Sequence, residues 1–246
     1  MERIERVSGA EAGSPVRDVA SALAELRKRI ERACALASRD AEAVHVLAVT
    51  KGFGPEAIEA AINANIADIG ENYLQEAQAK FASVVWPTRS TRHFIGRVQR
   101  NKARKIASLF DVVQTVDSAE IGQALDRGAR DAGKSLDVLI QVNVADDDRN
   151  GVAPESCAQL GRELAAMPNL RVRGVMAVGP LQADASAAAF ARAADAYRTL
   201  AREHASADLL SMGMSGDLEA AIAAGSTMVR IGTALFGPRP AKGKVE

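Results

Sequence analysis

Short runs of apolar and β-branched residues alternate with alanine-rich runs along almost the whole chain. The apolar runs are largely continuous, which is typical of strands that are buried on both faces of a parallel sheet. Parallel neighbours need a long crossover between them, and a helix is the usual one. The predicted strands are residues 44–51, 66–71, 92–96, 111–117, 136–144, 172–179, 208–214 and 228–237. Repeated βα units are therefore the expected plan.

Helical segments separate the predicted strands, and one more helix precedes them. The opening helix runs from Asp18 to Ser38, where apolar residues recur at helical spacing. The others lie near residues 55–64, 73–84, 100–109, 118–132, 154–167, 186–204 and 216–224. Eight such units in about 250 residues predict a single (β/α)8 TIM barrel of the α/β class with an extra N-terminal helix. The alternative is an open doubly wound sheet, but no G-x-G-x-x-G follows the first strand to favour it.

No linker interrupts the 246 residues, so we expect one domain over 1–246. Its termini, at about 1–15 and 238–246, are expected to be loose, since the tail "PRPAKGKVE" is polar and proline-rich. The charged N-terminus does not resemble a signal peptide, and no apolar run is long enough for a membrane span. We therefore expect no membrane association.

The balance of 31 basic and 31 acidic residues leaves no net charge to steer the chain to nucleic acid. The two cysteines, Cys34 and Cys157, are far apart and form no C-x-x-C motif. A disulfide scaffold or a zinc site is thus not expected, and a cytoplasmic location fits. No metal site is predicted.

Polar residues and glycines gather where the predicted strands end, and in a barrel these ends meet on the functional face. Lys51 ends the first strand in "LAVTKGFG", and Asn72 follows the second in "GENY". Lys51 has two interpretations: a strand end that simply reaches water, or an amine held in a pocket where it reacts. A low-dielectric pocket with a second cation would lower its pKa and free the neutral amine to attack a carbonyl.

Two small loops follow the seventh and eighth strands. In "SMGMSGDLEAA", Ser215 is placed to cap the next helix, and the plain interpretation is an ordinary well-capped helix. Gly232 and Thr233 form a second small turn, and together the two loops predict a phosphate cup. Arg230, inside the eighth strand, is either a salt-bridged structural residue or a ligand contact. An aldehyde that carries a phosphate would satisfy the lysine, the arginine and the cup, and pyridoxal 5'-phosphate (PLP) is such a molecule.

Other groups are less specific. His93 could titrate near the site or could be a hydrogen-bonded structural histidine. The basic cluster "RVQRNKARK", residues 97–105, could contact phosphate or form a solvated helix face.

The ordered motifs "AVTKGFGPEAI", "DIGENYLQE", "HFIGRVQRNK", "QVNV", "GVMAV" and "LSMGMSGDLEAAIAAGSTMVRIGTALFG" resemble those of the pyridoxal phosphate homeostasis protein family, also called the YggS or PROSC family. The resemblance extends from the opening helix to Gly237. It implies the barrel of fold-type III PLP proteins, like the barrel domain of alanine racemase.

The resemblance also implies roles for single residues. Lys51 would hold PLP as a Schiff base, and Asn72 would line the cofactor. Arg230 would face the pyridine nitrogen and keep it unprotonated, which weakens the ring as an electron sink. The phosphate would be held by Ser211, Gly232 and Thr233.

Three functions remain open at this stage. The first, implied by the resemblance, is a monomeric PLP carrier or buffer in vitamin B6 homeostasis that passes PLP transiently to apo PLP-dependent enzymes and has no strong catalysis of its own. The second is a weak amino-acid racemase with Lys51 as one base and Tyr73 or His93 as the other, since two-base racemisation needs a partner. The third is a cofactor-free lyase that forms a Schiff base with a phosphorylated sugar.

Overall fold

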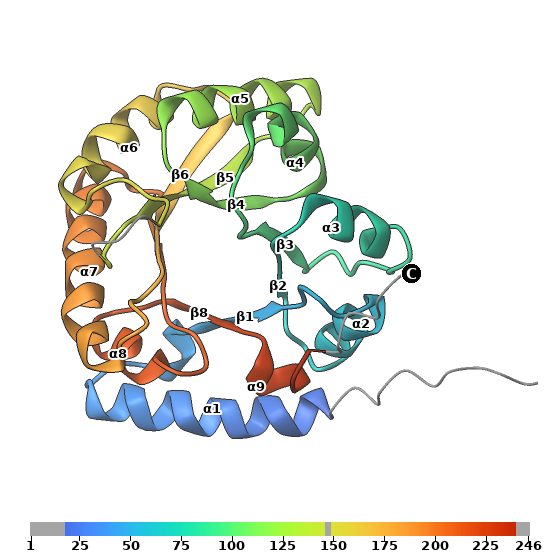
Figure 1. Cartoon of the computed structure of the whole chain (residues 1–246), viewed down its shortest axis with the longest axis vertical. Helices are drawn as coiled ribbons and strands as arrows, with labels where there is room; N and C mark the ends of the chain where they lie inside the picture. The colour runs from blue at the N-terminus through green and yellow to red at the C-terminus, as the bar shows by residue number, and fades with distance from the viewer. Residues whose placement is uncertain (1–17, 146–148, 240–246) are drawn as a thin grey trace, which may run out of the picture.

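A closed barrel of parallel strands forms the centre of the molecule in the computed structural model, which describes residues 18–145 and 149–239 (Figure 1). The strands pair in chain order, and β8 closes the barrel on β1. They are β1 (His45–Val49), β2 (Asp68–Glu71), β3 (Thr91–Phe94), β4 (Val112–Val116), β5 (Leu136–Val142), β6 (Leu170–Ala177), β7 (Leu209–Ser211) and β8 (Met228–Ile231). The predicted (β/α)8 barrel is confirmed.

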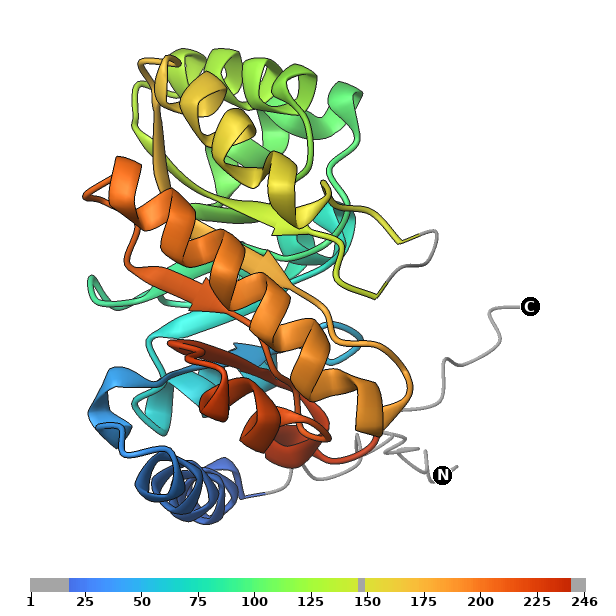
Figure 2. The same ribbon diagram turned by 90° about the vertical axis from the view of Figure 1, so that its left-hand side faces the viewer.

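Helices surround the barrel, and Figure 2 shows α7 crossing its outer surface. They are α1 (Val19–Leu36), α2 (Pro55–Asn63), α3 (Leu74–Phe81), α4 (Ala103–Leu109), α5 (Ala119–Asp131), α6 (Cys157–Ala165), α7 (Ser186–Glu203), α8 (Leu218–Ala223) and α9 (Thr233–Phe236). The extra helix α1 is capped by Asp18, whose Oδ1 accepts a hydrogen bond from the Ala20 amide at 3.1 Å. It packs against α8 and α9 and covers the part of the wall where the barrel closes.

Side chains alternate between the two sides of the barrel wall. Ala48 and Ile231 face outward into the large core between strands and helices. Leu47, Val49 and Met228 face inward and pack together inside the barrel. Because the period is two residues, polar residues in register with the inward set also lie inside the barrel.

The eighth predicted strand, residues 228–237, is longer than the observed one. β8 ends at Ile231, and residues 233–236 form the short helix α9, in which Phe236 is buried. The ring centroids of Phe236 and Phe53 lie 5.3 Å apart. This aromatic contact packs α9 against the loop that follows β1. Gly232 marks the break between strand and helix.

The predicted loose termini fall mostly outside the described residues, but Arg239 is described and lies at the cavity discussed below. Among the described residues no helix is long and apolar enough to cross a membrane. Within the same ranges, no cluster of histidine, cysteine, aspartate and glutamate side chains could hold a metal ion.

Candidate functional site

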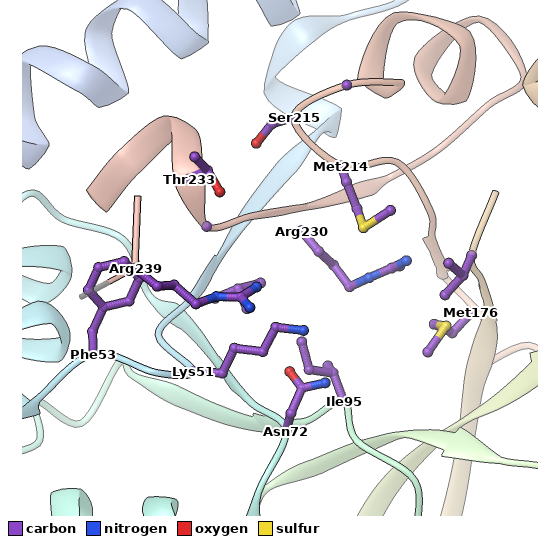
Figure 3. Close-up of a pocket in the computed structure, with 14 residues that line it drawn as sticks. Lys51, Phe53, Asn72, Ile95, Met176, Met214, Ser215, Arg230, Thr233 and Arg239 are labelled. Carbon is purple, nitrogen blue, oxygen red and sulfur yellow. The ribbon is translucent and has the colours of Figure 1, made fainter. Parts of the chain in front are cut away.

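A cavity of about 350 Å³ opens at the carboxyl ends of the strands (Figure 3). This is the end of the barrel at which the sequence predicts the functional groups. The cavity is lined by Val49, Lys51, Phe53, Asn72, Ile95, Met176, Val178, Met214, Ser215, Gly216, Arg230, Gly232, Thr233 and Arg239. These lining residues include three cations and no carboxylate, so the cavity suits an anionic ligand.

Lys51 follows β1 and extends its side chain into the cavity, with its amine near Asn72 (Figure 3). The turn after it depends on Gly52, whose φ of 79° is open to glycine at little cost. The amide of Gly52 donates to Oε1 of Glu76 at 2.6 Å. Both features fix the backbone from which the lysine side chain starts.

A buried ion pair supports the same turn from below. Nζ of Lys80 donates to the carbonyl oxygen of Thr50 at 2.8 Å and to Oε1 of Glu71 at 2.7 Å, and it lies 2.5 Å from Oε1 of Glu76. Thr50 also donates its hydroxyl to Glu71 at 2.6 Å. Burial raises the pKa of Glu71, and the charge and hydrogen bond of Lys80 oppose this rise. These contacts anchor the residue that precedes Lys51.

The pKa of Lys51 lies below its ordinary value. Burial is the largest cause, followed by the positive charges of Arg239 and Arg230, while Glu71 and Glu76 act in the opposite direction. A lowered pKa increases the share of neutral amine, which is the nucleophilic form. The structure thus places Lys51 in a cavity beside two further cations, and not at a strand end that simply reaches water.

Arg230 has the fixed acceptors that a buried guanidinium requires. Nη1 donates to the carbonyl oxygen and the hydroxyl of Ser211 at 2.7 and 2.9 Å, and Nη2 donates to the carbonyl oxygen of Ala177 at 2.8 Å. Burial lowers the pKa of Arg230 to about 10, so the group is still a cation at neutral pH. No carboxylate is among these hydrogen-bond acceptors, which leaves the guanidinium charge available to the cavity.

Asn72 lies beside Lys51 at the end of β2 (Figure 3). Its side-chain Oδ1 is buried and has no hydrogen-bond partner within the described part of the chain. The backbone of Asn72 packs closely on Gly96, where an added Cβ would lie 1.9 Å from the Asn72 carbonyl oxygen. The residue is held by its backbone, and its side-chain oxygen remains for a ligand.

The predicted phosphate cup needs one correction. Gly232 and Thr233 line the cavity as expected, but Ser211 does not. Ser211 is fully buried, and its hydroxyl donates to Oε1 of Gln114 at 2.7 Å on the inner side of the barrel. Ser215, four residues later, lines the cavity in its place.

Ser215 is not the helix cap that the sequence suggested. Helix α8 has Asp217 as its N-cap, without a side-chain hydrogen bond into the helix. Oδ1 of Asp217 accepts instead from the amide of Met214 and closes the loop. Ser215 and Gly216 therefore precede the helix and line the cavity. Ser215 lies beside Thr233 (Figure 3).

The two other predicted acid–base candidates lie elsewhere. His93 is buried in the barrel, where Nε2 lies 2.9 Å from Oδ1 of Asp68, away from the cavity lining. Tyr73 is 62% exposed and borders a neighbouring hollow of about 240 Å³. That hollow also includes Arg97 and Lys102 of the basic cluster.

Sequence reasoning missed two features of this site. Arg239 was assigned to the tail, and only the fold shows that the chain returns past α9 to the cavity (Figure 3). The buried Lys80–Glu71 pair belongs to no motif, and no feature of the sequence distinguishes it from the many other charged residues.

The fold and the site define a barrel of the alanine racemase type, with a lysine after the first strand and a cationic cavity at the carboxyl ends. The family model described as "Alanine racemase, N-terminal domain" matches residues 22–240. The chain belongs to the pyridoxal phosphate homeostasis protein family within this class.

The relatives support that membership over nearly the whole chain. The pyridoxal phosphate homeostasis protein of Pseudomonas aeruginosa is 44% identical over 230 residues, which cover 90% of this chain and 96% of the relative. The protein of the same name from Escherichia coli K12 is 40% identical over 228 residues, 90% of this chain and 97% of the relative.

Solved structures agree with the fold. PipY of Synechococcus elongatus, with PLP bound, is 34% identical, covers 89% of this chain and 100% of its own, and superposes with a TM-score of 0.76. Alanine racemase of Clostridium difficile superposes with a TM-score of 0.67 at 16% identity, over 94% of this chain and 61% of that chain. The second likeness concerns the fold alone.

Proposed function

We propose that this protein binds PLP as a Schiff base on Lys51 and acts in PLP homeostasis as a carrier or buffer. The observation that carries the proposal is the Lys51 amine, whose pKa is lowered in a cavity shared with Arg230 and Arg239. The names of the relatives and the PLP-bound structure of PipY support the choice of ligand.

The cavity residues fit PLP group by group. Ser215, Gly216, Gly232 and Thr233 form a small polar cup suited to a phosphate. The buried Oδ1 of Asn72, which lacks a partner in the described chain, is suited to a polar ligand group. Apolar side chains such as those of Ile95 and Met176 offer walls for an aromatic ring.

The residues of the cavity would bind and orient PLP. When bound, PLP supplies a reactive aldehyde carbon and an electron-withdrawing ring. Lys51 would provide the neutral amine that bonds to that carbon, with the aldehyde oxygen lost as water. Arg230, held on carbonyl oxygens and Ser211, presents a cation where the ring nitrogen would lie and disfavours its protonation.

A carrier needs the Lys51 anchor and the binding cavity, but it needs no second proton-transfer group. Among the described residues, no histidine, tyrosine, aspartate or glutamate lines the cavity beside Lys51. Racemisation needs such a group on the opposite face of the substrate. We therefore propose that the protein holds PLP without strong catalysis of its own.

The direct test is the visible absorption spectrum of the purified protein with added PLP. We expect a yellow band that borohydride discharges, and its loss in Lys51→Ala. Lys28→Ala is the matched control, because Lys28 is exposed and forms an ion pair with Glu25 on the surface. A protein that stays colourless with PLP would overturn the proposal and favour the sugar lyase, which a borohydride-trapped sugar phosphate would reveal.

Carrier and weak racemase differ in what the loaded protein does. As a carrier, it should restore activity to an apo PLP-dependent enzyme, with a transient contact between the two proteins. A racemase would exchange the Cα proton of alanine in heavy water, and Lys51→Ala would abolish the exchange.

We also propose that the protein is a cytoplasmic monomer; the buried, unpaired Cys34 and Cys157 support a reducing compartment. Light scattering measures the mass in solution.

A further inference from the structure

A continuous chain of hydrogen bonds crosses the inside of the barrel below the cavity. It starts at Asp68, whose Oδ1 lies 2.9 Å from Nε2 of His93, and Nδ1 of His93 lies 2.9 Å from Nε2 of Gln114. Oε1 of Gln114 accepts from the Ser211 hydroxyl at 2.7 Å, and that oxygen accepts from Nη1 of Arg230 at 2.9 Å. The chain links one end of the barrel to the cation at the other.

The link from Gln114 to Ser211 spans the barrel interior, because β4 and β7 are not neighbours in the closed sheet (Figure 1). Gln114 and Ser211 are fully buried, and His93 is 1% exposed. Water therefore does not compete for these groups, and each must satisfy its donors and acceptors within the chain.

The donors and acceptors allow one direction along the chain. Arg230 only donates, so the Ser211 oxygen accepts from it and gives its own hydrogen to Oε1 of Gln114. The two amide hydrogens of Gln114 then point to Nδ1 of His93 and to Sδ of Met228 at 3.3 Å. Consequently Nδ1 of His93 is an acceptor, and Nε2 carries the ring proton toward Asp68.

We propose that His93 and Gln114 are positioning residues for Arg230, which act through Ser211 and hold the guanidinium in its ligand-facing orientation. The meaning of that orientation rests on the proposed function of the cavity. Neither residue touches the ligand.

A proton on Nδ1 reverses the chain. Two donors would face each other, so the Gln114 amide must turn over and present Nε2 to Ser211. The Ser211 oxygen would then face donors from both Gln114 and Arg230, and its own hydrogen would lose its acceptor. Because a hydroxyl oxygen has two lone pairs, it could still accept from Arg230, but the hydroxyl would no longer be held in one orientation; the bonds of Arg230 to the carbonyl oxygens of Ser211 and Ala177 would stay as they are.

Within the described residues, the carboxylate that contacts the His93 ring is that of Asp68. A hollow of about 610 Å³ below His93 also contains His45 of β1, Asp137 of β5, Arg173 of β6 and Asp208 before β7. Arg173 pairs with both Asp137 and Asp208, at 2.6 Å each. On the other side the next charge along the chain is Arg230.

The experiment is nitrogen-15 NMR of the histidine ring and the arginine guanidinium, on the free protein at neutral pH. We expect His93 as the Nε2–H tautomer in the wild type. Gln114→Met removes the donor to Nδ1, so His93 should no longer be held in the Nε2–H tautomer, and the Arg230 signals should shift. PLP binding should weaken about tenfold, the size of one lost buried hydrogen bond. Gln114→Glu cannot donate to Nδ1, but it still offers Ser211 a carboxylate oxygen as acceptor. Its loss of affinity should be smaller than that of Gln114→Met.

A merely structural role for Gln114 would leave the His93 tautomer and the Arg230 signals unchanged, so these two signals are the decisive readouts. Gln159→Met, at an exposed glutamine of α6, is the control for the substitution itself. Thermal melts select variants that remain folded, and Ser211→Thr, which keeps the hydroxyl, should retain the wild-type Arg230 signals.

Three results would overturn the proposal: a proton on Nδ1 in the neutral-pH wild type, unchanged Arg230 signals in folded Gln114→Met, or unchanged PLP affinity in that variant. If the wild type binds no PLP at all, the proposed function fails. The tautomer and guanidinium signals, which need no ligand, still decide the positioning roles in that case.

Discussion

Nζ of Lys80 lies 2.7 Å from Oε1 of Glu71, and both side chains are sealed from solvent beneath the turn that carries Lys51. Such a pair contributes little compared with apolar packing, yet removing one partner leaves a buried charge alone. The pair also holds the carbonyl oxygen of Thr50, so stability and the position of the reactive lysine are linked.

The first prediction is the stability of Lys80→Met. We expect the free energy of unfolding to fall by about 3–5 kcal/mol, because Glu71 loses its counter-ion in a buried place. Chemical denaturation monitored by circular dichroism measures the change. The control is Lys28→Met, which breaks the exposed pair with Glu25 and should cost less than about 1 kcal/mol.

The same variant should respond to pH in one direction. Burial already raises the pKa of Glu71, and the loss of Lys80 raises it further. A group with a raised folded-state pKa contributes stability below its unfolded value of 4.5, and loses that contribution as the pH rises through the folded value. Acid should therefore recover part of the lost stability of Lys80→Met relative to the wild type; a constant difference across this range would contradict the account.

The second prediction concerns the reactivity of Lys51. Its lowered pKa means that neutral amine appears below the ordinary 10.5. Acetylation of Lys51, followed by mass spectrometry, should thus show a midpoint below that of an exposed lysine such as Lys28. Arg239→Ala removes a positive neighbour and should move the midpoint to higher pH, while Arg32→Ala on α1 should leave it in place. By linkage, this group favours the folded state increasingly as the pH rises through the same window.

Much of this site followed from chain order, and the part that did not depends on three-dimensional packing. Continuous apolar runs predicted the strands, and the rule about strand ends then brought Lys51, Asn72 and Thr233 together, because parallel strands end on one face. Ser211 and Ser215 could not be told apart by sequence, since the choice depends on where β7 ends and which way the residue faces. Arg239 was hidden because its place depends on the fold of α9.

The third prediction tests the cup. Thr233→Val and Ser215→Ala should each weaken PLP binding about tenfold, the size expected for one hydrogen bond to a charged group. Pyridoxal, which lacks the phosphate, should bind each variant about as well as it binds the wild type. Absorbance titration gives both affinities. Equal losses for the two ligands would place these residues elsewhere than at the phosphate.

The fourth prediction uses the close approach between Gly96 and Asn72. In Gly96→Ala the new Cβ would lie 1.9 Å from the Asn72 carbonyl oxygen, and backbone cannot yield as a flexible side chain can. We expect a loss of about 1–3 kcal/mol in the free energy of unfolding, typical of overpacking, together with weaker PLP binding as Asn72 is displaced. Gly133→Asn is the control, because no atom lies within 4 Å of an added Cβ there and asparagine tolerates its φ of 65°. Denaturation and absorbance titration separate the two effects: a variant that loses stability but binds PLP like the wild type would show that the ligand does not depend on where Asn72 stands.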